Sequence, residues 1–154
     1  MATERIKVIF LDIDGVLNSD NTIRTTRDGC TFVSVRQIKN LRHIIKETGA
    51  KVVLSSNWRI DRNEEFLNAD FLELKHELTK YGIRFYDYTP VMPSGHRGAE
   101  INQWLKEHHE VENFVILDDR CDIEPNKDHW VQTVMSRGLG RKEMEAAIQI
   151  LLAD

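Results

Sequence analysis

Three pairs of small polar residues each follow an apolar segment of the chain, and they are the residues best suited to chemistry. The pairs are Asp12 and Asp14, Ser55 and Ser56, and Asp118 and Asp119. Carboxylates are all-oxygen ligands, and two or three of them gathered in one place suit Mg²⁺, which usually also binds substrate phosphate. A serine hydroxyl and the backbone of a turn can donate hydrogen bonds to phosphate oxygens. If the pairs converge, the chemistry that they indicate is phosphoryl transfer.

Phosphoryl transfer also needs a fixed positive charge, because negative charge on the phosphoryl oxygens must be balanced in the transition state. Arg97 is the first candidate, since it stands at the start of a predicted helix in the segment GHRGAEINQWL, and His96 and Arg59 are the alternatives. A cation is needed for a second reason. Four carboxylates in one crevice repel one another and lose solvation, so some must be protonated or neutralised.

The segments that must position these residues alternate between strand and helix. Apolar runs predict strands over residues 5–11, 50–56, 83–86, 114–117 and 130–135, with helices over 35–48, about 70–81, 97–109 and 141–152. Continuous apolar strands are typical of a parallel sheet that is covered on both faces. In such a sheet the ligand lies beyond the carboxyl ends of the strands, so the polar pairs should meet. We therefore expect an α/β fold, a single Rossmann-like domain over 1–154.

The first predicted helix has clear local signals at both ends. Ser34 and Gln37 have the spacing of a capping box at its start, and Gly49 ends it. The polar segment 18–33 ahead of the helix has no period, and it predicts an irregular loop or a small flap.

Composition identifies an ordinary globular protein. The 154 residues are 41% apolar and 30% charged with only 3 prolines, which excludes a disordered or fibrous chain. No apolar run is long enough to span a bilayer, and the first residues lack the features of a signal peptide. We expect a cytoplasmic protein with no membrane partner, in which Cys30 and Cys121 are reduced thiols. Nothing in the sequence indicates an oligomeric state.

The charge is unevenly distributed along the chain. The net charge of −4 argues against a general nucleic-acid coat, yet residues 19–62 hold nine Lys/Arg against four Asp/Glu. A basic segment beside an acidic remainder hints at an anionic partner, although an ordinary helix surface explains the same pattern.

Four motifs, in order, resemble those of the haloacid dehalogenase (HAD) superfamily. The segment VIFLDIDGVL at 8–17 resembles the first motif, an apolar strand followed by Asp-x-Asp-Gly. VVLSS, Arg97 and FVILDD are similar to the second, third and fourth motifs. Together they span residues 8–119. A calcium-binding EF-hand loop fits poorly, because its glycine is sixth and its flanks are helices, whereas here the glycine is fourth and follows a strand.

The resemblance implies a role for each acidic residue. Asp12 would be the nucleophile that forms an aspartyl-phosphate, and Asp14 would protonate the leaving oxygen and then activate water. Mg²⁺ would be held by Asp12, the backbone carbonyl of Asp14 and Asp119, with Asp118 as a close supporting acid.

The resemblance also implies which residues bind the substrate. Ser56, with Ser55 as the alternative, would donate its hydroxyl to the phosphate, and Arg97 would pair with the same phosphate. Asn57 and Arg59 are further candidates for substrate binding. Trp58 between them can stack on a base, although a core tryptophan beside a surface arginine is the plainer interpretation.

The intervals between the motifs are too short for a separate cap domain. The resemblance is therefore to the small cap-less HAD phosphatases, including those of nucleic-acid repair proteins, whose open sites admit large substrates. It implies an Mg²⁺-dependent phosphomonoester hydrolase, and the open site together with the basic segment 19–62 favours a terminal phosphate of a nucleic acid or nucleotide as the substrate. Three alternatives stay open: a phosphatase for small sugar phosphates or phosphoproteins, a phosphotransferase, and a non-catalytic phosphate-binding module.

Overall fold

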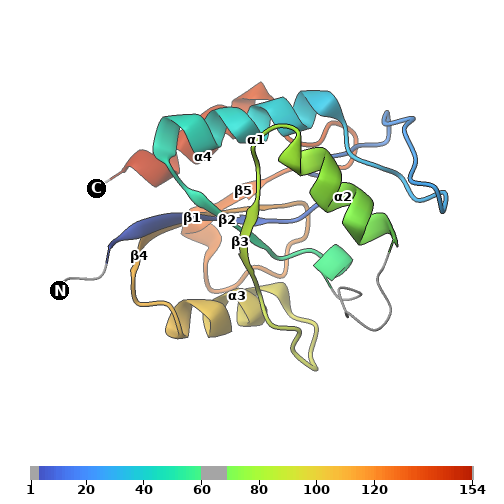
Figure 1. Ribbon diagram of the computed structural model, residues 1–154. Coiled ribbons are helices and arrows are strands. Elements are labelled where there is room, and N and C mark those ends of the chain that lie inside the picture. Colours follow the sequence, from blue (N-terminus) through green and yellow to red (C-terminus); the bar gives the residue numbers. More distant parts are fainter. Residues whose placement is uncertain (1–3, 60–68, 154) are drawn as a thin grey trace.

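The computed structural model describes residues 4–59 and 69–153, and its centre is one parallel sheet (Figure 1). The strand order is β3-β2-β1-β4-β5, and every neighbouring pair is parallel. The strands are β1 (Ile6–Leu11), β2 (Lys51–Leu54), β3 (Phe85–Tyr88), β4 (Val111–Asp118) and β5 (Trp130–Gln132). The α/β architecture expected from the sequence is confirmed.

Helices cover both faces of the sheet. They are α1 (Val35–Thr48), α2 (Ala69–Thr79), α3 (Arg97–Lys106) and α4 (Arg141–Leu152), with single 3₁₀ turns η1 (Asn57–Arg59) and η2 (Lys127–His129). Figure 1 shows α1 and α4 side by side on one face and α3 on the other. Within the described ranges no large cap domain is present, as predicted. No helix of those ranges has the length and apolarity that crossing a membrane requires.

Alternation along β1 divides the core into two layers. Ile9 and Leu11 face the α1 and α4 side, whereas Val8 and Phe10 pack with Trp104 on the α3 side. These four residues of β1 are fully buried. Because both faces of β1 are covered, its continuous apolar run is explained, and the strand is a rigid support for Asp12 at its end.

Several predicted boundaries are wrong, each for a local reason. β3 begins at Phe85 rather than 83, because the backbone N–H of Ile83 donates to Leu78 O and closes the turn after α2. β4 begins at Val111, which pairs with Ile6, so polar residues ahead of the apolar run join the strand. α3 consequently ends at Lys106 and not at 109, since the chain must turn into β4. β5 ends at Gln132.

The predicted capping box at the start of α1 is absent. Ser34 does precede the helix, but its side chain makes no capping hydrogen bond. Gln37 Nε2 instead donates to the carbonyl of Arg137, 2.9 Å away, in the loop before α4. The amide is used to hold that loop against α1, so it does not reach back to the helix start.

Candidate active site

The carboxyl ends of three neighbouring strands bring the predicted residues together. β1 lies between β2 and β4, and hydrogen bonds continue past the strand ends: Asp12 N donates to Leu117 O at 3.0 Å, and Ser55 N donates to Leu11 O at 2.8 Å. The predicted convergence of the polar pairs at this edge is therefore correct. It depends on the strand order, because each pair follows a strand that is adjacent to β1.

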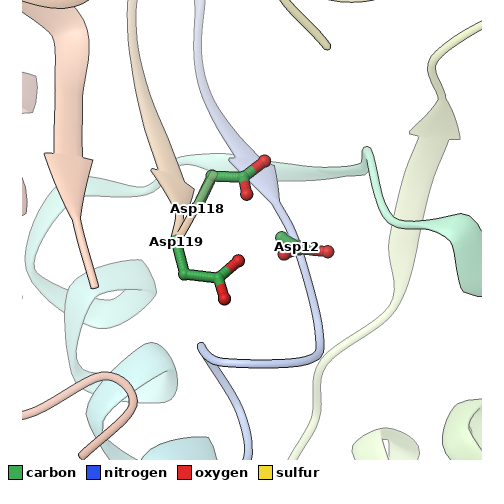
Figure 2. A group of neighbouring side chains, drawn as sticks. All are labelled: Asp12, Asp118 and Asp119. Atoms are coloured by element: carbon green, nitrogen blue, oxygen red, sulfur yellow. The ribbon is translucent and has the colours of Figure 1, made fainter. Parts of the chain in front are cut away.

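Asp12, Asp118 and Asp119 form a compact acidic cluster (Figure 2). Each offers a carboxylate oxygen, and these three oxygens lie within 4.8 Å of one another. Asp12 is 6% exposed and Asp118 is fully buried, whereas Asp119 is half-buried. Three carboxylates at this separation and burial require positive charge nearby.

Arg97 supplies positive charge in direct contact with two of these acids. Its Nη1 lies 3.3 Å from Asp118 Oδ2 and 3.6 Å from Asp12 Oδ1, and it also donates to the carbonyl of Ser55. The side chain is 1% exposed. The guanidinium therefore joins all three strand ends, and Asp118 is its nearest carboxylate.

The start of α3 fixes Arg97 in this position. The backbone N–H of Arg97 donates to Asp122 Oδ2 at 3.1 Å, and that of Gly98 donates to Asp122 O at 2.8 Å. A Cβ at Gly98 would collide with the carbonyls of Ile123 and Glu124, so only glycine allows this close approach. His96 Nδ1 accepts from Ala99 N at 3.0 Å and caps the helix.

One guanidinium is insufficient for the buried acids. Burial, followed by the charge of Asp118, raises the pKa of Asp12 well above its ordinary value, and Arg97 opposes the shift only in part. Burial likewise raises the pKa of Asp118 against the effect of Arg97. Further positive charge beside the cluster would therefore favour the ionised form of both carboxyls.

Asp14 has different surroundings from Asp12, although only one residue separates them. Its side chain is exposed, and both of its carboxylate oxygens accept hydrogen bonds: Oδ1 from Asn18 Nδ2 at 2.9 Å and Oδ2 from Trp58 Nε1 at 3.1 Å. Asn18 Oδ1 in turn accepts from Gly15 N at 2.9 Å. The turn and η1 thus hold the Asp14 carboxylate apart from the acidic cluster.

Gly15 allows Asp119 to approach the turn after β1. Its φ is +84°, in the left-handed region that favours glycine. A Cβ at this position would lie 2.5 Å from Asp119 Oδ2. The Asp119 carboxylate therefore sits against the turn that carries Asp12 and Asp14, while Asp118 faces Arg97.

Both candidate serines are buried at the end of β2, with 1% exposure each. Ser56 Oγ accepts from Trp58 N at 3.2 Å and keeps its hydrogen for donation. Ser55 Oγ has no hydrogen-bond partner among the described residues. Each hydroxyl can still donate to a phosphate, and the choice of Ser56 stays a prediction.

Arg59 has a different environment from the one expected of a substrate-binding residue. It is 1% exposed, pairs with Glu100 Oε1 at 2.9 Å and donates to the carbonyls of Ser55, Ser56, Thr89 and Pro90. These contacts hold the end of β2 in place. The prediction that Arg59 binds substrate, or that it lies on the surface, finds no support in this arrangement.

Asn57 and Trp58, by contrast, line an open pocket of about 700 Å³ beside Asp14. Asn18, Cys30 and Met135 are also part of its wall. Sequence reasoning missed three positioning residues: Asn18, Trp58 as a hydrogen-bond donor to Asp14, and Asp122. Of these three, only Asn18 could have been recognised in the sequence, because an asparagine four residues after Asp14 in a turn is suited to forming a hydrogen bond with the turn backbone.

Comparison with known proteins gives the class. The family model described as the HAD domain in Swiss Army Knife RNA repair proteins matches residues 8–144, and no curated protein matches the chain significantly. Fold and family together define a HAD superfamily hydrolase of the small cap-less type. More narrowly, the chain belongs to the family of HAD domains of Swiss Army Knife RNA repair proteins. Members of the superfamily generally use a divalent metal, and the buried aspartate cluster agrees with that use.

Two solved structures are similar in fold. One is a putative HAD superfamily (subfamily III A) hydrolase from Legionella pneumophila, at 15% identity and a TM-score of 0.50, covering 95% of this chain and 83% of that one. The other is the cobalt-bound deoxy-D-mannose-octulosonate 8-phosphate phosphatase from Haemophilus influenzae, at 14% identity and a TM-score of 0.46, covering 96% and 89%. The family membership supports a phosphatase-type hydrolase.

Proposed function

We propose that this domain is an Mg²⁺-dependent phosphomonoester hydrolase that forms an aspartyl-phosphate on Asp12 and acts on the terminal phosphate of a nucleic-acid strand. The observation that carries the proposal is the arrangement at the end of β1. Asp12 lies in a buried cluster with Asp118, Asp119 and Arg97, whereas Asp14 is held outside it by Asn18 and Trp58. Two carboxylates so close in sequence have environments suited to two different roles.

The donor set fits a hard divalent cation. Three carboxylate oxygens lie within 4.8 Å of one another, and the raised pKa of Asp12 reflects burial and the charge of Asp118 that Arg97 does not fully offset. The side chains of Asp12 and Asp119 and the backbone carbonyl of Asp14 would hold Mg²⁺. Asp118 would support the site through Arg97. Bound Mg²⁺ supplies positive charge that keeps Asp12 ionised and balances the phosphoryl oxygens.

In the first step a carboxylate oxygen of Asp12 attacks phosphorus, and the bond from phosphorus to the ester oxygen breaks. Asp14, in its acid form, gives its proton to that leaving oxygen, so the product departs as a neutral alcohol. Arg97 lies against Asp12 on the α3 side, where its charge offsets the charge of the transferred group. The serine hydroxyls at the end of β2 donate to the phosphoryl oxygens.

In the second step Asp14, now a carboxylate, takes a proton from a water molecule that attacks phosphorus. The acyl-phosphate bond breaks, which releases inorganic phosphate and restores the Asp12 carboxylate. The hydrogen bonds from Asn18 and Trp58 fix the orientation of Asp14 through both steps. An acceptor hydroxyl in place of water would make the reaction a phosphotransfer.

The nucleic-acid part of the proposal rests on two features. The family is described by its occurrence in RNA repair proteins, and within the described ranges no cap domain covers the crevice. An uncovered site admits the end of a polymer as readily as a small ester. The pocket beside Asp14 has Trp58 in its wall, which offers an aromatic face to a terminal base.

An assay of inorganic phosphate release tests the proposed hydrolase activity directly. The wild type should release phosphate from a generic aryl phosphate only with Mg²⁺, and Asp12→Asn should release none. Under matched conditions, kcat/KM should be higher for a 3′-phosphorylated oligonucleotide than for small sugar phosphates. No release from any ester by the wild type would contradict the enzymatic proposal, whereas a preference for the small esters would overturn only the nucleic-acid part.

A further inference from the structure

A basic groove lies next to the catalytic pocket, on the side of α1 and α4. Its volume is about 630 Å³, and the first turns of these two helices line it together with the loops 19–24 and 136–140. Ser19 and Thr22 line both this groove and the pocket that contains Asp14. The two depressions are therefore neighbours that share a wall.

Cations dominate the groove. The charged side chains in its lining are Arg24, Arg36, Arg137, Arg141, Lys142 and Glu143. Arg24 pairs with Glu77 at 3.4 Å and Arg141 pairs with Glu145 at 3.1 Å. The side chains of Arg36, Arg137 and Lys142 form no ion pair within 4–59 and 69–153, and all three are exposed. Three positive charges in one groove are thus left for an external anion.

The position of these cations in the helices strengthens the argument. Arg36, Arg141 and Lys142 stand in the first turns of α1 and α4, where the helix dipole disfavours positive charge. The first turn of α1 contains no acidic residue, and Ser34 makes no side-chain capping hydrogen bond, whereas the first turn of α4 contains Glu143. The uncompensated start of α1 and the three unpaired cations therefore make this groove positive, which favours a bound anion.

Hydrogen bonds hold the groove against residues 16–17, in the turn that follows β1. Gln37 Nε2 and Asn40 Nδ2 donate to the carbonyls of Arg137 and Leu139, at 2.9 and 2.8 Å. Ser34 N donates to Leu17 O, and Leu139 N donates to Val16 O, both at 2.7 Å. Residues 16–17 continue directly into Asn18, which bonds Asp14, so an anion in the groove has a defined place relative to the catalytic carboxylates.

We infer that this groove binds the phosphodiester backbone of the nucleic-acid strand whose terminal phosphate enters the Asp12 site. The inference rests on the proposed function and names the feature that would distinguish a strand from a small ester. A small phosphate monoester would occupy only the catalytic pocket. A strand extends over Ser19 and Thr22 and brings further phosphates to Arg36, Arg137 and Lys142.

Equilibrium binding tests the inference without turnover. In the Asp12→Asn background, fluorescence anisotropy would measure the Kd of a labelled, single-stranded, 3′-phosphorylated RNA. The groove variant is Arg36→Gln, Arg137→Gln and Lys142→Gln. The control variant is Arg42→Gln, Arg84→Gln and Lys51→Gln, which removes the same charge from exposed positions outside the groove.

The groove variant should raise Kd at least tenfold and the control variant less than about twofold. Because each phosphate contact to a single strand contributes about −0.7 to the slope of log K against log salt, the slope should fall in magnitude by about 2 in the groove variant only. Glu143→Gln, which removes the one acidic side chain of the groove, should tighten binding. Thermal melting of every variant verifies that it is folded.

Equal effects of the groove and control variants would overturn the inference, because binding would then follow net charge alone. A Kd unchanged in both variants would overturn it as well. Neither result depends on catalysis, so the groove and the proposed function can fail separately. If the wild type released phosphate from an aryl ester but the groove variant raised Kd no more than the control variant, the proposed function would stand and the groove inference would be wrong.

Discussion

The indole N–H of Trp58 donates a hydrogen bond to Asp14 Oδ2 at 3.1 Å, between residues 44 positions apart in the chain. η1 brings Trp58 from the end of β2 to the turn after β1. The contact gives the carboxylate of the proposed acid and base a fixed direction. It also separates Asp14 from the buried acids, so the two members of the Asp-x-Asp motif are distinguished by their partners.

Trp58→Phe should lower kcat about tenfold with little change in KM, since a hydrogen bond to a charged group is worth about 1.5–3 kcal/mol. This applies to an alkyl phosphate; for an aryl phosphate kcat/KM, which reports the first step alone, should change little, because its leaving group needs no proton from Asp14. Trp104→Phe is the control, as it removes an indole hydrogen bond to Asp87, at 2.8 Å, on the α3 side. Equal losses of kcat/KM for both esters would contradict the role given to Trp58.

Gly15→Ala should weaken Mg²⁺ activation. The new Cβ would lie 2.5 Å from Asp119 Oδ2 and displace that ligand, so the Mg²⁺ concentration for half-maximal activity should rise tenfold or more. Gly29→Ala separates this effect from backbone strain. Gly29 has a φ of +89° but no atom within 4 Å of the added Cβ, so it should lose about 1–2 kcal/mol of stability and keep its metal response. A normal Mg²⁺ response in Gly15→Ala would remove Asp119 from the ligand set.

Arg97→Met should abolish activity and destabilise the protein by about 3–5 kcal/mol, because it leaves Asp12 and Asp118 buried without their cation. Adding Asp118→Asn should recover part of that stability, since one of the uncompensated charges is then removed. Arg97→Lys should keep measurable activity, because lysine retains the positive charge and loses only the planar, bidentate donor geometry of the guanidinium. Denaturant unfolding and initial rates would measure both effects. Strict additivity of the two stability changes would show that Arg97 and Asp118 are not coupled.

Chelation of divalent metal should abolish turnover, and Mg²⁺ should restore it. Mg²⁺ should also raise the thermal midpoint of the wild type, because it binds the folded acidic cluster and not the unfolded chain. In Asp119→Asn the midpoint should rise even without Mg²⁺, because one repelling charge is gone, and the further response to Mg²⁺ should be lost. Calorimetric melting with and without metal measures both. A full Mg²⁺ response in Asp119→Asn would contradict its role.

Much of this arrangement could be predicted from the sequence because strand ends are local signals. Asp12, Ser55 and Asp118 each follow a continuous apolar run, and a parallel sheet brings such ends to one edge. Their direct contact depends in addition on the strand order, which places β1 between β2 and β4. The position of Arg97 could also be expected, since it begins the helix that leads into β4.

Contacts between distant side chains could not be predicted in this way. Arg59 is one residue from Trp58, yet it turns into the interior toward Glu100, whereas Trp58 turns to Asp14. No periodicity in the sequence predicts that these two side chains point in different directions, because the short 3₁₀ turn is fixed by a hydrogen bond to a residue 30 positions away. Gln37 likewise has the spacing of a cap, but the tertiary contact with Arg137 takes its amide.

Trapping the phosphoryl group on the enzyme would show whether Asp12 carries it. Asp14→Asn should still accept phosphate from an aryl ester, whose leaving group needs no proton, but should hydrolyse the intermediate slowly. After an acid quench, mass spectrometry should then find one phosphoryl group, on Asp12, and none in the variant that also carries Asp12→Asn. A phosphoryl group on any other residue, or rapid turnover by the double variant, would show that Asp12 is not the nucleophile.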